Sequence, residues 1–530
     1  MKIKKFLNSV YFPWSIPLLL VLIYHFVKSL DFPLHDFSNG YFSAYALSYL
    51  KNIEFIWDIF EFNTYIWDLD YPEVLVDFYI NTPFTISFFY PFTFFQDAYA
   101  AKAIFNLLGI SVFLMSLKML LNIYSNGTIR KYLLLLFPVL FFVPLRNQIL
   151  FGQSYFYVFA CIVFSLVFLE KNRGKIAAFF LVLAALLKIF PVIYGSIFLI
   201  QRKYRSIFLV MVFGVILILM SLFIIDFNIW ELYLFQVLPE TIKNQSSVGF
   251  QFNAQSFSVF IKTLFVHDDF YNPMAVFNSF GGYVILLWLF KSIILGFSIR
   301  ASLDNRQDNY AQFAIWTVSL LLIQDRTATY TQLLWIIPFI YIFSKPIKIK
   351  CKVFVSASLL VLCNIPLNWL EPLPIVLRFG RMWLSIVLGI IFFLFLIKGN
   401  TLKTQLLTLI VISPLCILSI INYDRPQAKY VLDNKGYFMV FDYGVENGKL
   451  YYEALGKEGR VKEETGILVH SFEDNTVKII DNQLFYKGKQ ITNEKSLKAN
   501  PVLVDNKEVY FLSDYNSRRM HYALRKVSIE

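Results

Sequence analysis

The chain contains few charged residues and few cysteines. Of its 530 residues, 16% are charged, whereas a typical soluble domain has about 25%. The four cysteines (Cys161, Cys351, Cys363 and Cys416) lie in or beside apolar segments. They show neither a disulfide framework nor the spacing of a metal site. The composition therefore argues against a soluble protein and against a disulfide-stabilised one.

Several functional motifs are also absent from the sequence. It contains no GxxxxGK nucleotide loop, no recognisable Ser-His-Asp arrangement and no HExxH, so chemistry that needs a nucleotide-binding fold is not expected. Residues 1–5 resemble the basic start of a signal peptide, but no small-residue cleavage site follows the next apolar stretch. The first span is therefore expected to remain as an anchor.

Long apolar runs dominate the rest of the sequence. The chain is 57% hydrophobic and 19% aromatic, with a mean hydropathy of +0.58. Repeated runs of spanning length predict a mainly α fold, a polytopic bundle of roughly thirteen hydrophobic helices. The expected spans are Phe12–Leu30, Ala98–Tyr124, Lys131–Arg146, Ser154–Leu169, Ile176–Ile200, Ile207–Ile225, Tyr283–Arg300, Ala311–Ile323, Ala328–Phe343, Val353–Ile365, Ile375–Ile397 and Leu406–Ile421.

The net charge of +12 is explained by membrane topology rather than by a nucleic-acid partner. Lysines and arginines sit mostly in short turns between spans, as the positive-inside rule predicts for cytoplasmic turns. The basic residues before the first span place the N-terminus in the cytoplasm. Two long loops, residues 31–83 and 226–281, are then expected outside. The first is rich in aromatics and acids and should contain interfacial helices.

The segment 176–200 departs from this alternation. Basic clusters flank it on both sides, so both of its ends should be cytoplasmic, yet its 25 or so residues amount to one span. Pro191 interrupts it within Lys188-Ile-Phe-Pro191. Either one tilted span or two short helices would fit. The proline favours two helices that meet at the break and line a cavity.

The composition changes after Tyr423. Residues 424–530 are charged, with alternating runs separated by Gly and Asn turns, which is typical of antiparallel strands. We expect a membrane domain over residues 1–422 and an all-β domain over 423–530. The span count places the β domain on the extracytoplasmic side.

Polar residues inside apolar segments are the first candidates for function, because ionisable groups at membrane depth are costly. Lys188 is the clearest, although a lysine there could also snorkel to an interface. Arg146 and Gln153 lie at the mouth of neighbouring spans. In the second outside loop a polar cluster interrupts an aromatic segment, and it is either a binding surface or simply solvated. This cluster comprises Asn253, Gln255, Ser256 and Lys262.

Two carboxylates and a histidine directly follow the first span, in the segment Asp31-Phe-Pro-Leu-His-Asp36-Phe37. Asp31 belongs to the stretch Asp31-Phe-Pro, which is typical of the end of a membrane span. Asp36 stands before the long outside loop, with a lysine-bearing helix break downstream. We therefore single out Asp36 as the candidate catalytic carboxylate. His35 could tune Asp36 or merely face water.

Several blocks in this order resemble the family-87 glycosyltransferases, multipass enzymes of the GT-C superfamily. They are Asp36-Phe37 with Tyr41 and Tyr45, Asn81 to Pro91 followed by Ala98 to Leu107, Phe151-Gly-Gln153, Ala184 to Pro191 with Arg202-Lys203, and Asn253-Ala-Gln-Ser-Phe257 with Lys262. The resemblance covers roughly residues 12–345. Tyr330 departs from it, because histidine-rich sequence is expected there, and so does the β domain.

The resemblance implies a mannosyl- or arabinofuranosyltransferase-like enzyme of the cytoplasmic (inner) membrane. Its donor would be a polyprenyl-phosphate monosaccharide, and its acceptor a glycan or lipid on the extracytoplasmic face. Asp36 would act as general base, with inversion at the sugar. Lys188, with Arg146, would stabilise the departing phosphate. No cofactor beyond this lipid-linked donor is expected. A divalent metal requirement stays open, because no oxygen-ligand spacing supports a site.

Two functions other than glycosyl transfer also fit the sequence. A transporter or flippase also uses broken helices with midplane charges, but no second broken span is evident in a corresponding half of the chain. A non-enzymatic envelope protein could instead use its β domain to bind a polymer or a protein.

Overall fold

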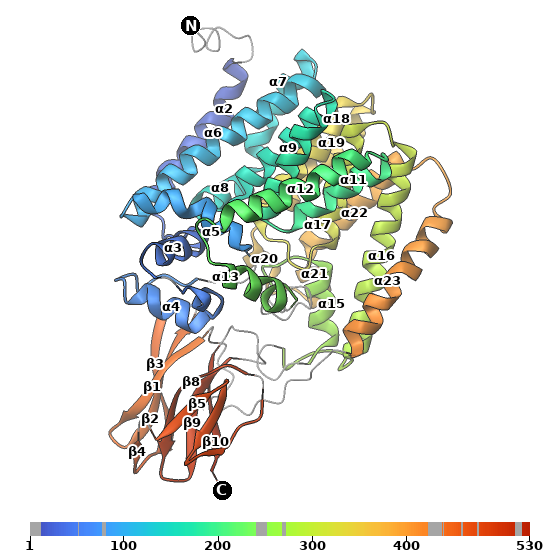
Figure 1. The fold of residues 1–530 in the computed structure, drawn as a ribbon. Helices are drawn as coiled ribbons and strands as arrows, with labels where there is room; N and C mark the ends of the chain where they lie inside the picture. The colour runs from blue at the N-terminus through green and yellow to red at the C-terminus, as the bar shows by residue number, and fades with distance from the viewer. Residues whose placement is uncertain are drawn as a thin grey trace.

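The computed structural model describes residues 12–50, 52–76, 81–239, 252–267, 272–421, 437, 439–456, 459–473, 476–494, 496–514 and 522–529. A bundle of helices forms most of the molecule, and a β-sheet region is attached to one end of it (Figure 1). The predicted fold class, mainly α with a C-terminal β part, is confirmed.

Within the described residues, five helices are long and apolar enough to cross a membrane. They are α2 (Phe12–Leu30), α6 (Ala98–Tyr124), α12 (Tyr204–Ser221), α16 (Phe280–Asp304) and α23 (Leu402–Ile421). Shorter helices pack among them, namely α9 (Tyr155–Glu170), α10 (Gly174–Leu187), α17 (Asn309–Ile323), α18 (Ile336–Ser344), α19 (Ile349–Asn364) and α22 (Gly380–Leu396). The chain is therefore a multi-pass membrane protein.

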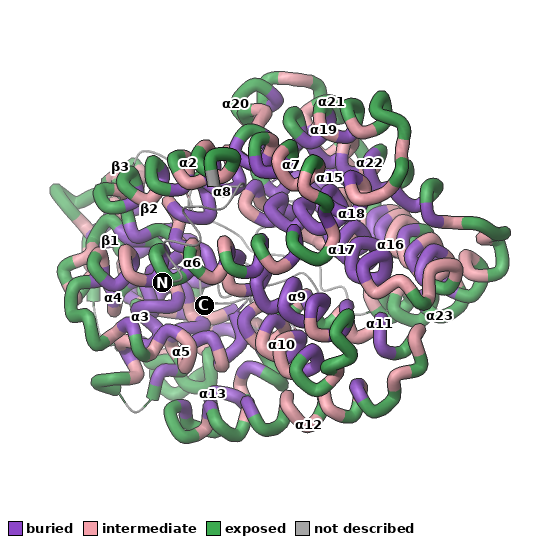
Figure 2. The backbone as a smooth tube through the Cα atoms, turned by 90° about the horizontal axis from the view of Figure 1, so that it is seen from above, coloured by how far each residue is buried: buried purple, intermediate pink, exposed green. Residues whose placement is uncertain are grey.

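Burial separates the centre of the bundle from its edge. Helices α9 and α17 are buried along nearly their whole length, whereas α12 and α23 are largely exposed (Figure 2). The exposed side chains of these outer helices are mostly apolar. An apolar face of this extent is stable against lipid rather than water.

The third predicted span is bent rather than straight. Helices α7 (Gly127–Leu140) and α8 (Phe142–Leu150) meet at an angle of 62°. Pro144 causes the break, because its ring nitrogen has no hydrogen to donate to the Leu140 carbonyl. The side chain of Asn364 in α19 replaces the lost partner. Its amide nitrogen donates to the Leu140 carbonyl at 2.9 Å, and its oxygen accepts from the Val143 N–H at 3.1 Å.

The segment 176–200 consists of two short helices, as the proline favoured. Helix α10 ends at Leu187, and Lys188 is extended, with φ −148° and ψ 130°. A 3-10 turn (Phe190–Tyr194) and α11 (Gly195–Ile200) follow. The break leaves the carbonyl of Leu186 without a helical partner, and it accepts a hydrogen bond from the hydroxyl of Thr82.

The basic turns gather at one end of the bundle. There Lys345 pairs with Asp308 at 3.0 Å, and Asn309 donates to Glu170 at 2.9 Å. The turn between α11 and α12 joins the same cluster, since Gln201 donates to Asn309 at 2.9 Å. This segregation of basic turns is what a chain crossing a membrane repeatedly produces.

The first long loop is folded at the other end. It contains α3 (Asp36–Tyr49), a 3-10 turn (Glu54–Trp57) and α4 (Ile59–Trp67), followed by α5 (Pro83–Phe89) and a second 3-10 turn (Tyr90–Phe94). Their aromatic side chains share one buried cluster with α6 and with α13 (Phe227–Leu232) of the second loop. The second loop also contains a π-helical turn (Tyr233–Val237) and α15 (Phe257–Phe265).

The C-terminal region forms three antiparallel sheets within the described residues. One has the order β1-β2-β3, the next β10-β9-β8-β4, and the last β5-β6-β7. The strands are β1 (Met439–Glu446), β2 (Lys449–Gly456), β3 (Gly459–Leu468), β4 (Phe472–Glu473), β5 (Val477–Ile480), β6 (Gln483–Tyr486), β7 (Lys489–Gln490), β8 (Lys498–Val504), β9 (Glu508–Ser513) and β10 (Ala523–Ser528).

The β region packs directly against α4 of the first loop (Figure 1). Tyr522 donates a hydrogen bond to the carboxylate of Asp58 at 2.6 Å. The guanidinium of Arg460 lies 4.2 Å from the centre of the Trp67 ring. Ile59 and Phe60 of α4 belong to the same apolar cluster as β1 and β2. The first loop and the β region must therefore lie on the same side of the membrane.

Candidate functional site

The turn between α8 and α9 is the structural centre of the candidate site. Gln153 N–H donates to the Gln148 carbonyl at 3.0 Å, and Gly152 N–H donates to the Ile149 carbonyl at 3.3 Å. These two bonds form a Schellman cap, which requires a left-handed residue. Gly152 provides it, with φ +65°. A Cβ at this glycine would lie only 2.5 Å from the Cβ of Phe37, so glycine also permits close approach to α3.

This turn holds the start of α3. The N–H of Phe37 donates to the carbonyl of Phe151 at 2.9 Å. The side-chain amide of Gln153 donates to one carboxylate oxygen of Asp36, and Nδ1 of His35 lies 3.2 Å from the other. The His35 ring stacks on the Phe151 ring with their centres 3.9 Å apart. Two segments distant in sequence, the Asp-Phe and Gly-Gln motifs, therefore form one unit.

A buried lysine that was not predicted as a site residue lies behind this unit. Nζ of Lys102 in α6 donates to the carbonyl of Pro33 at 2.6 Å and to that of Phe32 at 3.2 Å. Lys102 is also close enough to Asp36 to interact with it electrostatically. The lysine thus fixes the chain just before Asp36. A charged residue inside the apolar run 98–124 was the available signal.

Two tyrosines lie next to the turn that holds Asp36. Tyr155 begins α9, and Tyr330 lies in the 3-10 turn Thr329–Trp335 that precedes α18. Their ring centres are 5.3 Å apart, and the Asp36 carboxylate acts on both electrostatically. Tyr330, which departs from the family pattern, is thus part of the site's wall.

Lys188 reaches the same wall from the helix break. Its Nζ lies 5.9 Å from the centre of the Tyr155 ring and donates to the side-chain oxygen of Asn81 at 3.0 Å. Phe190, two residues beyond Lys188, stacks on the same tyrosine with centres 5.6 Å apart. Lys188 therefore lies against the ring of Tyr155, two residues after the Gln153 that binds Asp36.

Arg146 lies in a different group of contacts. Its Nε donates to the side chain of Asn147 at 3.1 Å, and its guanidinium is close enough to His25 and Arg381 to act on both. The prediction that Arg146 and Lys188 together stabilise one phosphate stays a prediction.

The polar cluster of the second loop divides into exposed and buried members. Asn253 is exposed, whereas Gln255, Ser256 and Lys262 are buried. Ser256 caps α15 by accepting from the Val259 N–H at 3.2 Å, and its hydroxyl donates to the carbonyl of Asp325 at 2.6 Å. Gln255 and Ser256 therefore have structural contacts that position this loop.

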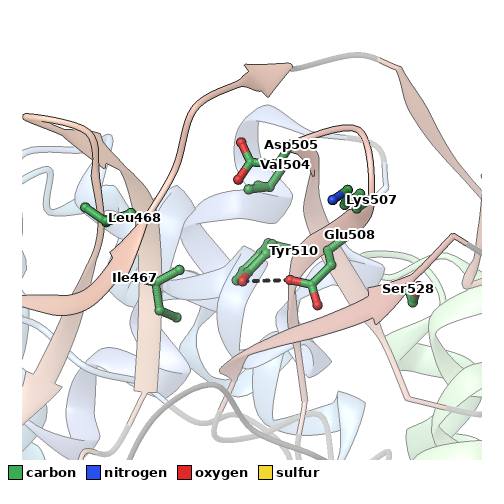
Figure 3. A pocket seen from close by; sticks show the side chains of 8 residues that line it. All are labelled: Ile467, Leu468, Val504, Asp505, Lys507, Glu508, Tyr510 and Ser528. Atoms are coloured by element: carbon green, nitrogen blue, oxygen red, sulfur yellow. Dashed lines mark hydrogen bonds between the residues drawn. The ribbon is translucent and has the colours of Figure 1, made fainter.

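A hollow of about 320 Å³ lies in the β region (Figure 3). Both of its carboxylates already accept hydrogen bonds. Tyr510 donates to Glu508 at 3.1 Å, and Asp505 accepts from the N–H groups of His470 and Ser471, both at 2.7 Å. This hollow would be the place to look for a ligand if the β region were a binding module.

No group of three or more His, Cys, Asp or Glu side chains within the described residues is placed to hold a metal ion.

Comparison with known proteins supports the resemblance seen in the motifs. The model of glycosyltransferase family 87 matches residues 79–324. No curated protein matches the chain. The matched segment contains Lys102, Gln153, Tyr155 and Lys188, whereas Asp36 precedes it and Tyr330 follows it. Over residues 79–324, just under half of its length, this multi-pass membrane protein is similar to the family-87 glycosyltransferases.

Proposed function

We propose that the protein transfers a monosaccharide from a polyprenyl-phosphate donor to a glycan or lipid acceptor, with Asp36 as the general base. One observation carries this proposal. The Asp36 carboxylate is held by Gln153, two residues before Tyr155, and Lys188 lies over the ring of Tyr155. A fixed carboxylate and a nearby cation are the two groups that a displacement at a phosphate-activated sugar needs.

In the proposed reaction, an acceptor hydroxyl oxygen attacks the anomeric carbon of the donor. The hydroxyl proton passes to the Asp36 carboxylate as the new C–O bond forms. The bond between the anomeric carbon and the phosphate oxygen breaks, and its electron pair leaves with the polyprenyl phosphate. The charge of Lys188 stabilises this departing anion. A single displacement inverts the anomeric centre.

The topology fits a donor delivered through lipid. Outside the cell nucleotide sugars are not available, so an activated sugar must arrive on a lipid carrier. We propose that the face with α3, α4 and residues 423–530 is extracytoplasmic, that the basic turns are cytoplasmic, and that the protein resides in the cytoplasmic (inner) membrane. The break at Lys188 lies at the same face as Asp36, where the phosphate group of a membrane-embedded lipid carrier would be located.

The test compares Asp36→Asn with Asp31→Asn in membranes supplied with labelled polyprenyl-phosphate hexoses and pentoses. Asp31 lies in the same segment and is exposed, so it is a matched control. We expect Asp36→Asn to lower transfer by about 10²- to 10⁴-fold and Asp31→Asn to leave it near the wild-type rate. Full transfer by a stably inserted Asp36→Asn variant would rule out Asp36 as the base.

A transporter is the main alternative, since the structure contains a second bent span in α7–α8 besides the break at Lys188. Both bends fall within residues 127–200, whereas inverted repeats would place them in corresponding halves. Proteoliposomes loaded with a fluorescent polyprenyl phosphate would separate the two functions. Flipping without sugar transfer would favour the transporter.

A further inference from the structure

Helix α6 carries two buried polar side chains on the face that meets the ends of α2 and α8. Lys102 and Asn106 are four residues apart, so they lie on the same side of the helix. Their exposed fractions are only 1% and 2%. A buried charge is costly in an apolar environment, and an apolar side chain would be accommodated more easily. The lysine is therefore a candidate for a functional role.

Lys102 binds the chain between α2 and α3. Its Nζ donates to the carbonyl of Pro33 at 2.6 Å and to that of Phe32 at 3.2 Å. The same nitrogen lies 5.3 Å from the centre of the Phe32 ring. Of residues 31–35, only Leu34 is buried. The lysine thus restrains a turn that is otherwise largely exposed.

This turn ends in a strained backbone conformation directly before Asp36. His35 has φ 50° and ψ −138°, a region that is unfavourable for any residue with a Cβ. Such a conformation persists only where surrounding contacts hold it. The His35 ring is held by its stack on Phe151, and the carbonyls just before it are held by Lys102. These contacts together fix where the chain enters α3, whose first residue is Asp36.

Asn106 acts one turn further along α6. Its side-chain amide donates to the carbonyl of Ile149 at 2.9 Å and to the hydroxyl of Ser29 at 3.3 Å. The Ile149 carbonyl also accepts the N–H of Gly152, in the turn that holds Asp36. Ser29 lies in the last turn of α2. Asn106 therefore fastens the ends of α2 and α8 to one helix.

We infer that Lys102 and Asn106 are positioning residues for Asp36. Both are buried and bonded to the protein itself, so they act by holding the two segments that meet at the carboxylate, the turn after α2 and the turn after α8. This inference rests on the proposed function, in which Asp36 accepts the proton of the acceptor hydroxyl. A shift of the base by about 1 Å can lower the rate of such a step by about 100-fold.

The first measurement is steady-state transfer by Lys102→Met with a labelled polyprenyl-phosphate sugar. Methionine keeps much of the volume but removes the charge and both hydrogen bonds. We expect kcat to fall by about 10- to 100-fold and KM for the donor to stay unchanged, because Lys188 is untouched. Lys102→Arg, which keeps the charge, should recover part of the rate. Lys102→Gln, which is neutral but can still donate, replaces the methionine variant if that variant does not insert.

Lys118→Met is the matched control for this substitution. Lys118 is an exposed lysine of the same helix, and its replacement should leave both kcat and KM at the wild-type values.

A comparison of double variants separates positioning from a general loss of structure. If Lys102 acts through Asp36, Lys102→Met should cause no further loss of transfer when Asp36 is already asparagine. Asn106→Leu should likewise lower kcat only in the presence of the carboxylate. Losses that multiply in the double variants, or a raised donor KM with an unchanged kcat, would overturn the inference.

Hydrogen exchange of the full-length protein in nanodiscs gives a readout that needs no turnover. Lys102→Met should speed exchange in the peptide spanning residues 31–38 by about tenfold, whereas Lys118→Met should not change it. Unchanged exchange in Lys102→Met would overturn the inference even if transfer were slow, and so would faster exchange with a wild-type kcat. Faster exchange in the variant, combined with no sugar transfer by the wild type, would count against the proposed function alone.

Discussion

The side-chain amide of Gln153 donates a hydrogen bond to the carboxylate of Asp36, although the two residues are 117 positions apart in the chain. The Schellman cap at Gly152 and the hydrogen bond from Phe37 to Phe151 fix this contact from both sides. The amide leaves part of the carboxylate available and restricts its rotation. Gln153 is thus a positioning residue in the proposed mechanism.

Replacing this amide should slow transfer without unfolding the protein. A hydrogen bond to a charged group contributes about 1.5–3 kcal/mol, so Gln153→Ala should lower kcat by roughly 10- to 100-fold. KM for the donor should change little, because Lys188 is untouched. The measurement is steady-state transfer with a labelled donor, alongside a thermal melt. An unchanged kcat would show that Asp36 needs no such support.

Gly152→Ala should destabilise the protein. Left-handed backbone is unfavourable for alanine by roughly 1–2 kcal/mol, and the new Cβ would also meet Phe37 at 2.5 Å. We expect a lower melting temperature in a thiol-reactive dye assay on purified protein. Gly214→Ala is the control, because nothing lies within 4 Å of a Cβ there and alanine is the better helix former. Equal melting temperatures for the two variants would contradict the proposed role of the cap.

Lys188→Gln should impair use of the donor more than folding. The variant keeps a side chain able to bind Asn81 but loses the charge that faces the leaving phosphate, and loss of one such group typically lowers kcat by about 10²- to 10³-fold. Lys188→Arg should restore part of the rate, because it restores the charge. If Lys188→Gln and Lys188→Arg were equally impaired, geometry rather than charge would be the cause.

Arg460→Ala should loosen the contact between the β region and α4. The guanidinium stacks on Trp67 at 4.2 Å and on Phe441 at 4.7 Å, and such stacks contribute about 0.5–2 kcal/mol. Faster hydrogen exchange of α4 amides in the variant would show it. Lys449→Ala, which removes only an exposed ion pair with Glu464, should leave the exchange of α4 unchanged.

One carboxylate of the β region predicts a pH dependence of stability. The backbone N–H groups of Ser471 and His470 hold the pKa of Asp505 below its usual value. A depressed pKa stabilises the fold at pH values above the unfolded pKa of 3.8, and this stabilisation is lost as the pH falls through the folded pKa. Asp505→Asn should therefore be less stable than the wild type at pH 7, and the difference should shrink as the pH falls below 3.8 through the folded pKa. A difference independent of pH would show that Asp505 stabilises the β region through geometry rather than through its charge.

The sequence predicted those features that depend on local residue types. The apolar runs indicated the spans, Pro191 favoured the break after Leu187, and the alternating segments after Tyr423 indicated strands. Pro144 was equally visible, yet the bend of α7–α8 was missed, because a straight run from Lys131 to Arg146 also satisfied the hydropathy.

The site could be predicted only in part, since it is built from distant contacts. Asp36, Gln153 and Lys188 were selected separately, and their catalytic and binding roles remain predictions. Nothing local indicated that Gly152 would approach Phe37 or that Tyr330 would join the wall. Lys102 lay in a segment predicted only as a span, and its contact with Pro33 depends on tertiary packing.

The side chain of Asn364 ties α19 to both sides of the bend between α7 and α8. Because both sides of the bend are bound to the same side chain, the angle between α7 and α8 is fixed rather than free to change. In the proposed mechanism, a tilt of α19 would move α8 through Asn364, and with it the turn that binds Asp36. Helix α19, which contributes no residue to the candidate site, would thereby influence the position of the carboxylate.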